Sequence, residues 1–244
     1  MFKVILLILF TMCIVDSAKA QDQFETDNIT TSIGDLKIIF IGHGSLIFTF
    51  NGKIILVDPC GKLADYSALP KADIILITHE HGDHFDLTAI EKLRTEKTQL
   101  VLTKTCAEKI SGGIVMKNGE VQTVQGIKIE AVPAYNIIHK RDNEQPFHPQ
   151  GVGNGYIITF GDQRVYVAGD SENILEMKVL QGIDVAFLPM NLPYTMTPEM
   201  VADAAKAFKP KILYPYHYGD TDTSKLVKLM KDYKEIEVRI RKMN

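Results

Sequence analysis

The chain has 244 residues, of which 45% are hydrophobic and 23% are charged, and its formal net charge is -3. This composition is that of a globular protein with enough apolar residues for a large core, and the length allows one domain or two. Because the charge is slightly negative and no run of lysine or arginine occurs, we expect no nucleic-acid partner.

The first twenty residues differ from the rest of the chain. Lys3 precedes an almost unbroken apolar run over residues 4–15, and the sequence A-K-A at residues 18–20 has the small-x-small pattern of a cleavage site. These features predict a secretory signal peptide over residues 1–20, with a membrane anchor as the alternative because the run is short for a full span. The mature protein is then expected in the periplasm or outside the cell, with no stable membrane span.

Residues 21–32 are polar and are predicted to be a flexible lead-in. Two cysteines follow the predicted cleavage site, Cys60 and Cys106. They can pair in an oxidising compartment, but nothing in the sequence places them close together, so their pairing is left open.

Three apolar runs of strand type come next, at residues 36–41, 46–50 and 53–57, and Asn51-Gly52 between the last two predicts a two-residue hairpin. The glycine turn between the first two runs presents His43. A histidine in such a turn is usually only exposed, although loops carry binding and catalytic residues more often than strands do, so a function for His43 is one of two readings.

A buried strand is predicted at residues 74–77, and the sequence T-H-E-H-G-D-H follows it directly at residues 78–84. Imidazole nitrogen and carboxylate oxygen are ligands that suit zinc and related divalent ions. A tight loop after a strand can direct alternate side chains to one centre and their neighbours to a second. The motif therefore predicts a site for one or two metal ions, formed by His79, His81, Asp83 and His84.

The rest of the chain alternates between strand-like and helix-like segments. Strands are predicted at residues 100–102, 121–124, 127–132, 156–160, 165–168, 185–188, 212–214 and 236–240, and helices at residues 87–94, 107–110, 174–180, from Thr197 onward, and 226–230. Residues 136–154 are long, polar and without period, which is typical of a functional lid or rim. This irregular segment contains His139 and His148.

Two further candidate ligands each follow the C-terminal end of an apolar strand. Asp170 comes after residues 165–168, and His217 comes after residues 212–214. Taken singly, Asp170 reads as a surface turn residue and His217 as a packed histidine. Loops over one edge of a layered fold can bring such residues together, so we interpret them jointly with His79 as one coordination set.

With these motifs, the sequence resembles the metallo-β-lactamase superfamily of metal-dependent hydrolases. The resemblance covers nearly all of the mature chain and rests on G-H-G-S at residues 42–45, V-D-P at 57–59, T-H-E-H-G-D-H at 78–84, A-G-D at 168–170 and Y-H at 216–217. The branch containing ascorbate-6-phosphate lactonase is the most similar, through L-P at 188–189, Y-T-M at 194–196 and P-Y-H at 215–217. The resemblance implies an α/β fold over residues 33–244, a four-layer αβ/βα sandwich of two mixed sheets with outer helices.

The resemblance also implies a ligand set. His79 and His81 would bind a first metal, while Asp83, His84 and His217 would bind a second. Asp170 would bridge the two, and zinc is the expected ion, with manganese or iron as alternatives. Many relatives have a further histidine for the first metal, and Asn136 stands in its place here. The first site is then looser, takes a different ion, or borrows His139 or His148; we expect His148 near the site, bound to metal or to substrate.

The activity implied is hydrolysis of an ester, lactone or phosphodiester bond in a small molecule by a metal-activated water. Asp83 would orient the nucleophile or accept its proton, and His43 would contact substrate or protonate the leaving group. Tyr194 and Thr195 would shape the pocket wall. An alternative is a metal-binding or ligand-binding protein without turnover, since Asn136 weakens the first site. The oligomeric state is left open.

Two other activities of the superfamily are not favoured. Asp170 stands where the best-known zinc β-lactamases often have cysteine, which argues against β-lactam hydrolysis. His81 stands where the di-iron flavoproteins of this fold typically carry glutamate, and no flavin-binding domain is appended. A redox role is therefore not expected.

Overall fold

The structure is a computed structural model that describes residues 23–244. The signal peptide predicted over residues 1–20 lies outside the described residues. Within the described part of the chain, no helix is long and apolar enough to cross a membrane.

The first half of the chain forms a seven-stranded sheet whose spatial order follows the sequence, β1 to β7. Its strands are β1 (Glu25–Thr31), β2 (Gly34–Gly42), β3 (Ser45–Phe50), β4 (Lys53–Val57), β5 (Ile74–Leu76), β6 (Gln99–Leu102) and β7 (Gly113–Val115). The pairs from β1 to β4 are antiparallel, and the pairs from β4 to β7 are parallel. The sheet is therefore mixed, as expected.

The second half repeats this plan in a second seven-stranded sheet, in which β8 to β14 are also neighbours in sequence order. Its strands are β8 (Val121–Val124), β9 (Ile127–Ala134), β10 (Gly153–Phe160), β11 (Gln163–Val167), β12 (Val185–Pro189), β13 (Ile212–Tyr216) and β14 (Glu237–Val238). Again the first pairs are antiparallel and the later pairs are parallel.

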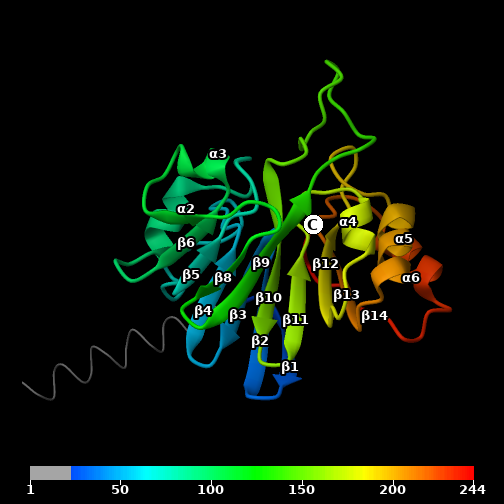
Figure 1. Cartoon of the computed structure of the whole chain (residues 1–244). Coiled ribbons are helices and arrows are strands. Elements are labelled where there is room, and N and C mark those ends of the chain that lie inside the picture. Colours follow the sequence, from blue (N-terminus) through cyan, green and yellow to red (C-terminus); the bar gives the residue numbers. More distant parts are fainter. Residues whose placement is uncertain (1–22) are drawn as a thin grey trace, which may run out of the picture.

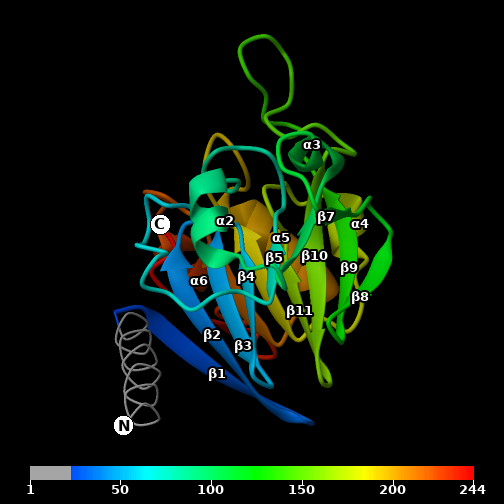
Figure 2. The same cartoon turned by 90° about the vertical axis from the view of Figure 1, so that its left-hand side faces the viewer.

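The two sheets pack face to face, and helices cover their outer faces (Figures 1 and 2). The helices are α2 (Leu87–Leu93) and α3 (Lys104–Ala107) on the first sheet, and α4 (Leu175–Lys178), α5 (Pro198–Phe208) and α6 (Thr223–Met230) on the second. Separate buried apolar clusters join each sheet to its helices. This confirms the predicted four-layer sandwich.

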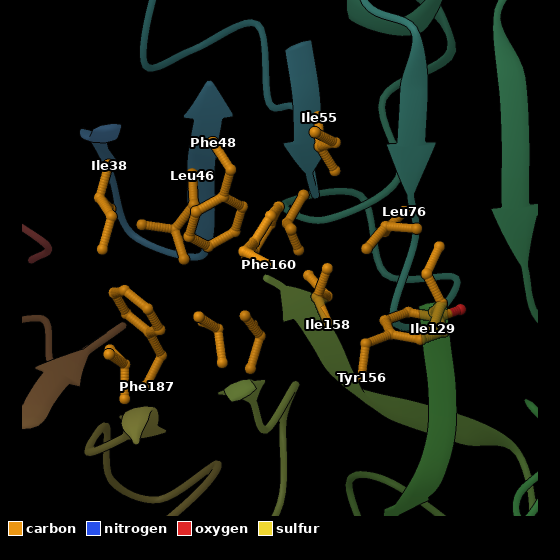
Figure 3. Close-up of a cluster of buried hydrophobic side chains, with 14 of the residues drawn as sticks. Ile38, Leu46, Phe48, Ile55, Leu76, Ile129, Tyr156, Ile158, Phe160 and Phe187 are labelled. Atoms are coloured by element: carbon orange, nitrogen blue, oxygen red, sulfur yellow. The ribbon is translucent and has the colours of Figure 1, made fainter. Parts of the chain in front are cut away.

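A third buried cluster lies between the sheets and is rich in aromatic rings (Figure 3). Phe48 of the first sheet lies 5.5 Å from Phe160 of the second, and Phe187 stacks on Tyr214 at 4.9 Å between ring centroids. Because such rings each bury a large apolar area, this layer holds the two halves of the chain in one fixed relation.

Local signals placed most elements correctly. Asn51 and Gly52 both have positive φ, 47° and 74°, as a type I′ hairpin turn requires. The side chain of Asp86 accepts hydrogen bonds from two backbone N–H groups at the start of α2, and Thr197 does the same once at the start of α5. The central strands are buried on both faces, as in β5 and β12, where every residue is buried.

The predicted lead-in over residues 21–32 is wrong for most of its length, because Glu25–Thr31 forms β1 and pairs with β2 along all of it. Among the described residues of this segment, Ile29 is the only buried apolar one, so the sequence lacks the apolar pattern that predicts a strand. β1 is also held by a residue that is distant in sequence, since Asp27 accepts hydrogen bonds from Arg241 Nη2 at 2.7 and 2.9 Å. The C-terminal segment thus fixes the N-terminal strand.

The short helix predicted at residues 107–110 is displaced, because Thr103 caps it and it runs from Lys104 to Ala107. Gly113 begins β7, where an added Cβ would come within 2.7 Å of the Leu102 side chain. Cys60 and Cys106 are both buried and free, so the open question of their pairing is answered against a disulfide.

Candidate metal centre

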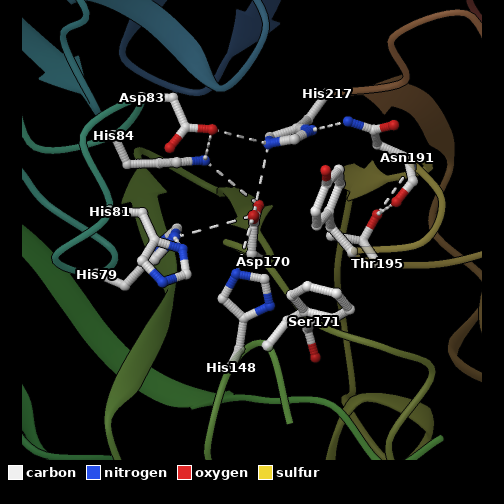
Figure 4. Close-up of polar contacts among 12 residues, drawn as sticks. His79, His81, Asp83, His84, His148, Asp170, Ser171, Asn191, Thr195 and His217 are labelled. Atoms are coloured by element: carbon white, nitrogen blue, oxygen red, sulfur yellow. Dashed lines mark hydrogen bonds and ion pairs between the residues drawn. The ribbon is translucent and has the colours of Figure 1, made fainter. Parts of the chain in front are cut away.

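Several strand ends meet at one edge of the sandwich and form the site there. His43 follows β2, the 78–84 motif follows β5, Asp170 follows β11, and His217 follows β13. These strands point the same way within each sheet, so the loops after them converge above the inter-sheet core. Figure 4 shows the converging side chains.

The loop after β5 is a compact turn in which the backbone N–H groups of His84 and Phe85 both donate to the carbonyl of His81, at 3.0 and 2.8 Å. This fold-back directs His79 and His81 to one side and Asp83 and His84 to the other (Figure 4). The motif therefore contributes side chains to two clusters, whereas its spacing left one or two metal ions open.

The first cluster consists of His79, His81 and His148, whose ligand atoms lie within 4.8 Å of one another. His79 Nε2 is 3.1 Å from His81 Nδ1, and His148 Nε2 is 3.2 Å from Asp170 Oδ2. His79 Nε2 lies 3.8 Å from the same carboxylate oxygen. Three imidazoles and a carboxylate around one point are a ligand set that suits zinc.

The second cluster consists of Asp83, His84 and His217, with His43 beside them. His84 Nε2 and His217 Nε2 each lie 3.8 Å from Asp83 Oδ2. They also lie 3.5 Å and 3.4 Å from the two oxygens of Asp170. Asp170 therefore faces both clusters.

Three of these atoms are buried without a hydrogen-bond partner in the described residues, namely His84 Nε2, His217 Nε2 and Asp170 Oδ1. A buried polar atom left unpaired costs about 1–3 kcal/mol, so three around one point call for a common partner. A divalent cation satisfies nitrogen and carboxylate lone pairs at once. The residues present therefore fit a metal centre.

The charge states of these groups suit cation binding. Burial raises the pKa of Asp170, but the imidazoles of His217 and His84 lower it more, so the pKa lies well below its usual range. Burial and the neighbouring His84 hold the pKa of His79 well below 6.5, which leaves a neutral imidazole. An ionised carboxylate and neutral imidazoles are the forms that bind metal.

His84 behaves differently in the metal-free protein. Burial lowers its pKa, whereas the carboxylates of Asp170 and Asp58 raise it, to about 9. His84 then carries a proton at neutral pH, which a cation has to displace. Metal binding is therefore expected to release a proton and to strengthen as the pH rises toward this value.

Asp58 is a functional residue that the sequence reasoning did not select. It is fully buried, and its Oδ2 lies 2.8 Å from His84 Nδ1. Thr78 donates to the same carboxylate from its backbone N–H at 2.8 Å and from its hydroxyl at 2.6 Å. A carboxylate on Nδ1 turns Nε2 of the histidine toward the metal. The V-D-P sequence at the end of β4 was its only signal.

We expect Asp58→Asn to lower metal affinity at the second cluster by about 10- to 100-fold, since the asparagine keeps the shape but not the charge that orients His84. Competition with a chelating indicator measures the affinity. Asp65→Asn is the matched control, because Asp65 lies in the same connection between β4 and β5 but its side chain is 67% exposed. Equal affinities in the two variants would contradict the role of Asp58.

The structure agrees with the expectation that the first site borrows His148 where Asn136 stands in place of a histidine, because the His148 imidazole lies with those of His79 and His81. Asn136 Oδ1 accepts hydrogen bonds from the backbone N–H and from Nδ1 of His148, at 2.8 and 2.7 Å. Its Nδ2 donates to the carbonyl of Tyr194 at 2.9 Å. Asn136 therefore orients the third imidazole, so that Nε2 points to Asp170 and the first cluster.

Glu172 holds the base of the irregular segment and was also missed. Its buried carboxylate accepts from the backbone N–H groups of Ile137, Ile138 and His139, at 2.9, 2.8 and 2.7 Å. It also contacts Asn136 Nδ2 at 3.1 Å and His139 Nδ1 at 2.8 Å. His139 is thus committed to Glu172 and joins neither cluster, which removes it as a candidate ligand.

The remaining predicted residues line the second cluster or lie behind it. His43 Nε2 is 3.0 Å from Asp83 Oδ2, and the His43 ring centroid lies 3.6 Å from that of His217. His43 and His217 both have positive φ, 51° and 47°, a strained conformation that is enriched at functional sites.

A cleft of about 440 Å³ opens over the second cluster, and Tyr194 lines it. Thr195 does not, since it is fully buried and its hydroxyl accepts from the Asn191 backbone N–H at 2.8 Å. The predicted role of Thr195 as a pocket wall is therefore corrected to holding the turn that presents Tyr194.

Known proteins are similar to this chain in sequence and fold. The family model described as a beta-lactamase superfamily domain matches residues 37–217. A UPF0173 metal-dependent hydrolase of Thermus thermophilus is 31% identical over 192 residues, covering 75% of this chain and 84% of that protein.

Two solved structures are also similar. A protein of Parabacteroides distasonis, provisionally named a metal-dependent hydrolase, is 51% identical with a TM-score of 0.87, and the match covers 91% of this chain and 100% of that one. Igni18, a metallo hydrolase of Ignicoccus hospitalis, has a TM-score of 0.70 at 24% identity, covering 86% and 96% of the two chains. At that identity the likeness of Igni18 shows the fold alone.

Proposed function

Because this chain belongs to the beta-lactamase superfamily and resembles its metal-dependent hydrolases along most of its length, we propose that it is a secreted binuclear zinc hydrolase of a small ester, lactone or phosphodiester. The observation that carries the binuclear site is Asp170, whose buried carboxylate faces both clusters. One carboxylate between two sets of ligand atoms can hold a pair of ions close together.

The chain's own residues divide the chemistry between them. Bound zinc ions would polarise the scissile bond and lower the pKa of a water from about 15.7 to about 7. Asp83, with a side chain 47% exposed, faces the cleft and can orient that water or take up its proton. His43 lies 3.0 Å from Asp83 and can pass a proton to the leaving group.

Location and substrate class complete the proposal. The signal-peptide pattern over residues 1–20 supports a periplasmic or secreted protein. The net charge of -3 without a basic run supports a small-molecule substrate rather than nucleic acid. The placement beside ascorbate-6-phosphate lactonase is also proposed, on the motifs at 188–189, 194–196 and 215–217. We do not favour the non-enzymatic alternative, since it rested on Asn136 and His148 can complete the first cluster.

The test is activity that depends on metal. We expect the purified mature protein to contain about two metal ions and to hydrolyse at least one generic ester, lactone, thioester or phosphodiester substrate. A strong chelator should remove the activity, and zinc, manganese or iron(II) should restore it to different extents. Elemental analysis and a chromogenic substrate panel measure both quantities. Full metal loading without turnover on any class would reject the proposal.

A further inference from the structure

The cleft over the second cluster has two unlike walls. Its lining includes candidate metal ligands and His43, and also Arg141 and Phe147 from the irregular segment and Tyr194 from the loop after β12, which we call the rim. Phe147 and Tyr194 meet edge to face, with ring centroids 5.0 Å apart and planes at 77°. The rim therefore offers an aromatic surface and one permanent positive charge.

Arg141 is not committed to any carboxylate. Within residues 23–244 it forms no ion pair, whereas its neighbour Lys140 pairs with Glu144 at 3.5 Å. Its guanidinium lies over the Phe147 ring at 5.0 Å and donates to the Phe147 carbonyl at 3.4 Å. Stacking of this kind fixes the plane of the guanidinium and leaves most of its donors available.

The segment that carries Arg141 is held in shape. Arg141 donates its backbone N–H to the carbonyl of Gln145 at 2.8 Å and accepts from Glu144 at 3.0 Å, so the tip is a closed turn. Glu172 clamps the base of the segment through three backbone N–H groups. The irregular segment stands out from the sandwich at the edge where the site lies (Figures 1 and 2).

The local charge differs in sign from that of the whole chain. The net charge is -3, yet two divalent ions would outweigh the carboxylates of Asp83 and Asp170, and Arg141 adds to the excess. A cleft with charge of one sign concentrates small ions of the other sign. Anionic substrates are therefore favoured over neutral ones of the same shape.

We propose that Arg141 is a specificity-determining residue, which binds a carboxylate or phosphate group of the substrate at the end away from the scissile bond. The apolar part of the substrate would lie along Phe147 and Tyr194. This inference rests on the proposed function and narrows it to substrates that carry a second, anionic group. Carboxylate and phosphate share the recognition chemistry, because both match the guanidinium with two hydrogen bonds.

Equilibrium binding to the zinc-loaded protein tests this without turnover. We would titrate acetate, the α,ω-dicarboxylates from succinate to adipate, and the matching phosphonocarboxylates by calorimetry. At least one two-headed anion should bind about 10- to 100-fold more tightly than acetate, since a charge-assisted contact is added at the second head. Whether a phosphonate or a carboxylate gains more identifies the preferred group.

The variant Arg141→Gln should reduce this advantage to the acetate level and leave acetate binding unchanged, while Arg141→Lys retains part of it. Lys140→Gln is the matched control, because Lys140 carries the adjacent charge of the same segment but does not line the cleft. The inference is overturned if no two-headed anion exceeds acetate, or if Arg141→Gln preserves the advantage.

Kinetics separate this inference from the function on which it rests. For an ester with a terminal carboxylate, Arg141→Gln should raise KM by about 10- to 100-fold, with little change for the neutral ester of equal length. If the Arg141→Gln variant hydrolyses both esters without a selective rise in KM, only the role of Arg141 is rejected. Absence of hydrolysis of every substrate class would reject the function, whatever the binding series shows.

Discussion

Asp170→Ala is expected to lower kcat/KM by at least about 1,000-fold and to reduce the metal content below one ion per chain. Its carboxylate lies 3.2 to 3.8 Å from ligand atoms of both clusters, so one substitution damages both. Loss of paired-ion catalysis removes several kcal/mol of transition-state stabilisation, which corresponds to a factor of this size. Elemental analysis and steady-state kinetics on the same preparation measure the two effects together.

Asp232→Ala is the matched control, because Asp232 is exposed and lies far along the chain after α6. It should keep both metal content and activity. Circular dichroism should show the same secondary structure in the two variants, since Asp170 contributes to the site rather than to an apolar cluster. Near-normal turnover in Asp170→Ala with both ions retained would remove the bridging role.

His148→Ala is expected to remove one metal ion and to reduce activity by more than about 100-fold, which exceeds the usual effect of residues that only orient a ligand. His148 is the one ligand that comes from the irregular segment, and it completes the cluster of His79 and His81. Asn136→Ala should cost less, about 10- to 100-fold in metal affinity, because the imidazole stays but loses its orientation.

Asn136→His distinguishes a ligand role for Asn136 from its role in orienting His148. If Asn136 stood in a ligand position, a histidine there would strengthen the first site. In the structure its oxygen accepts from His148 and its nitrogen donates to the Tyr194 carbonyl, so a bulkier imidazole breaks both bonds in a buried place. We therefore expect weaker metal binding, measured by chelator competition. Tighter binding would return Asn136 to the ligand set.

His139→Ala is the control for the substitutions of His148 and Asn136. His139 belongs to the same segment but contacts Glu172 and neither cluster, so both ions should be retained. A modest loss of activity is expected, since the base of the segment loses one of the contacts that Glu172 makes. Loss of an ion in this variant would show that the segment positions His148 less rigidly than its hydrogen bonds indicate.

Most elements of the fold follow from short-range patterns. The hairpin at Asn51-Gly52 and the helix starts at Asp86 and Thr197 each depend on a few neighbouring residues, and all three occur as predicted. β1 was missed because its stability comes from pairing with β2 and from Asp27 contacting Arg241, which lies 214 residues away. Polar strands of this kind carry little local signal.

The candidate site divides in the same way. His79, His81, Asp83 and His84 belong to one compact turn, and their spacing alone indicated metal. Asp170 and His217 were found because ends of parallel strands meet at one edge of a sheet, which a pattern of strands predicts. Asp58 and Glu172 were missed, because a buried carboxylate that orients another side chain has no signature of its own in one sequence.

The sequence by itself determined the family, the sandwich and the chemistry, because the motif at residues 78–84 and the periodicity of the strands are local properties. Only the tertiary structure decided which residue completes the first cluster. That choice depends on how residues 136–152 travel away from β9 and return to β10, and Glu172 sets this path across the sheet. A loop without period places its side chains through long-range contacts, so the His148 imidazole joins the first cluster and Asn136 orients it.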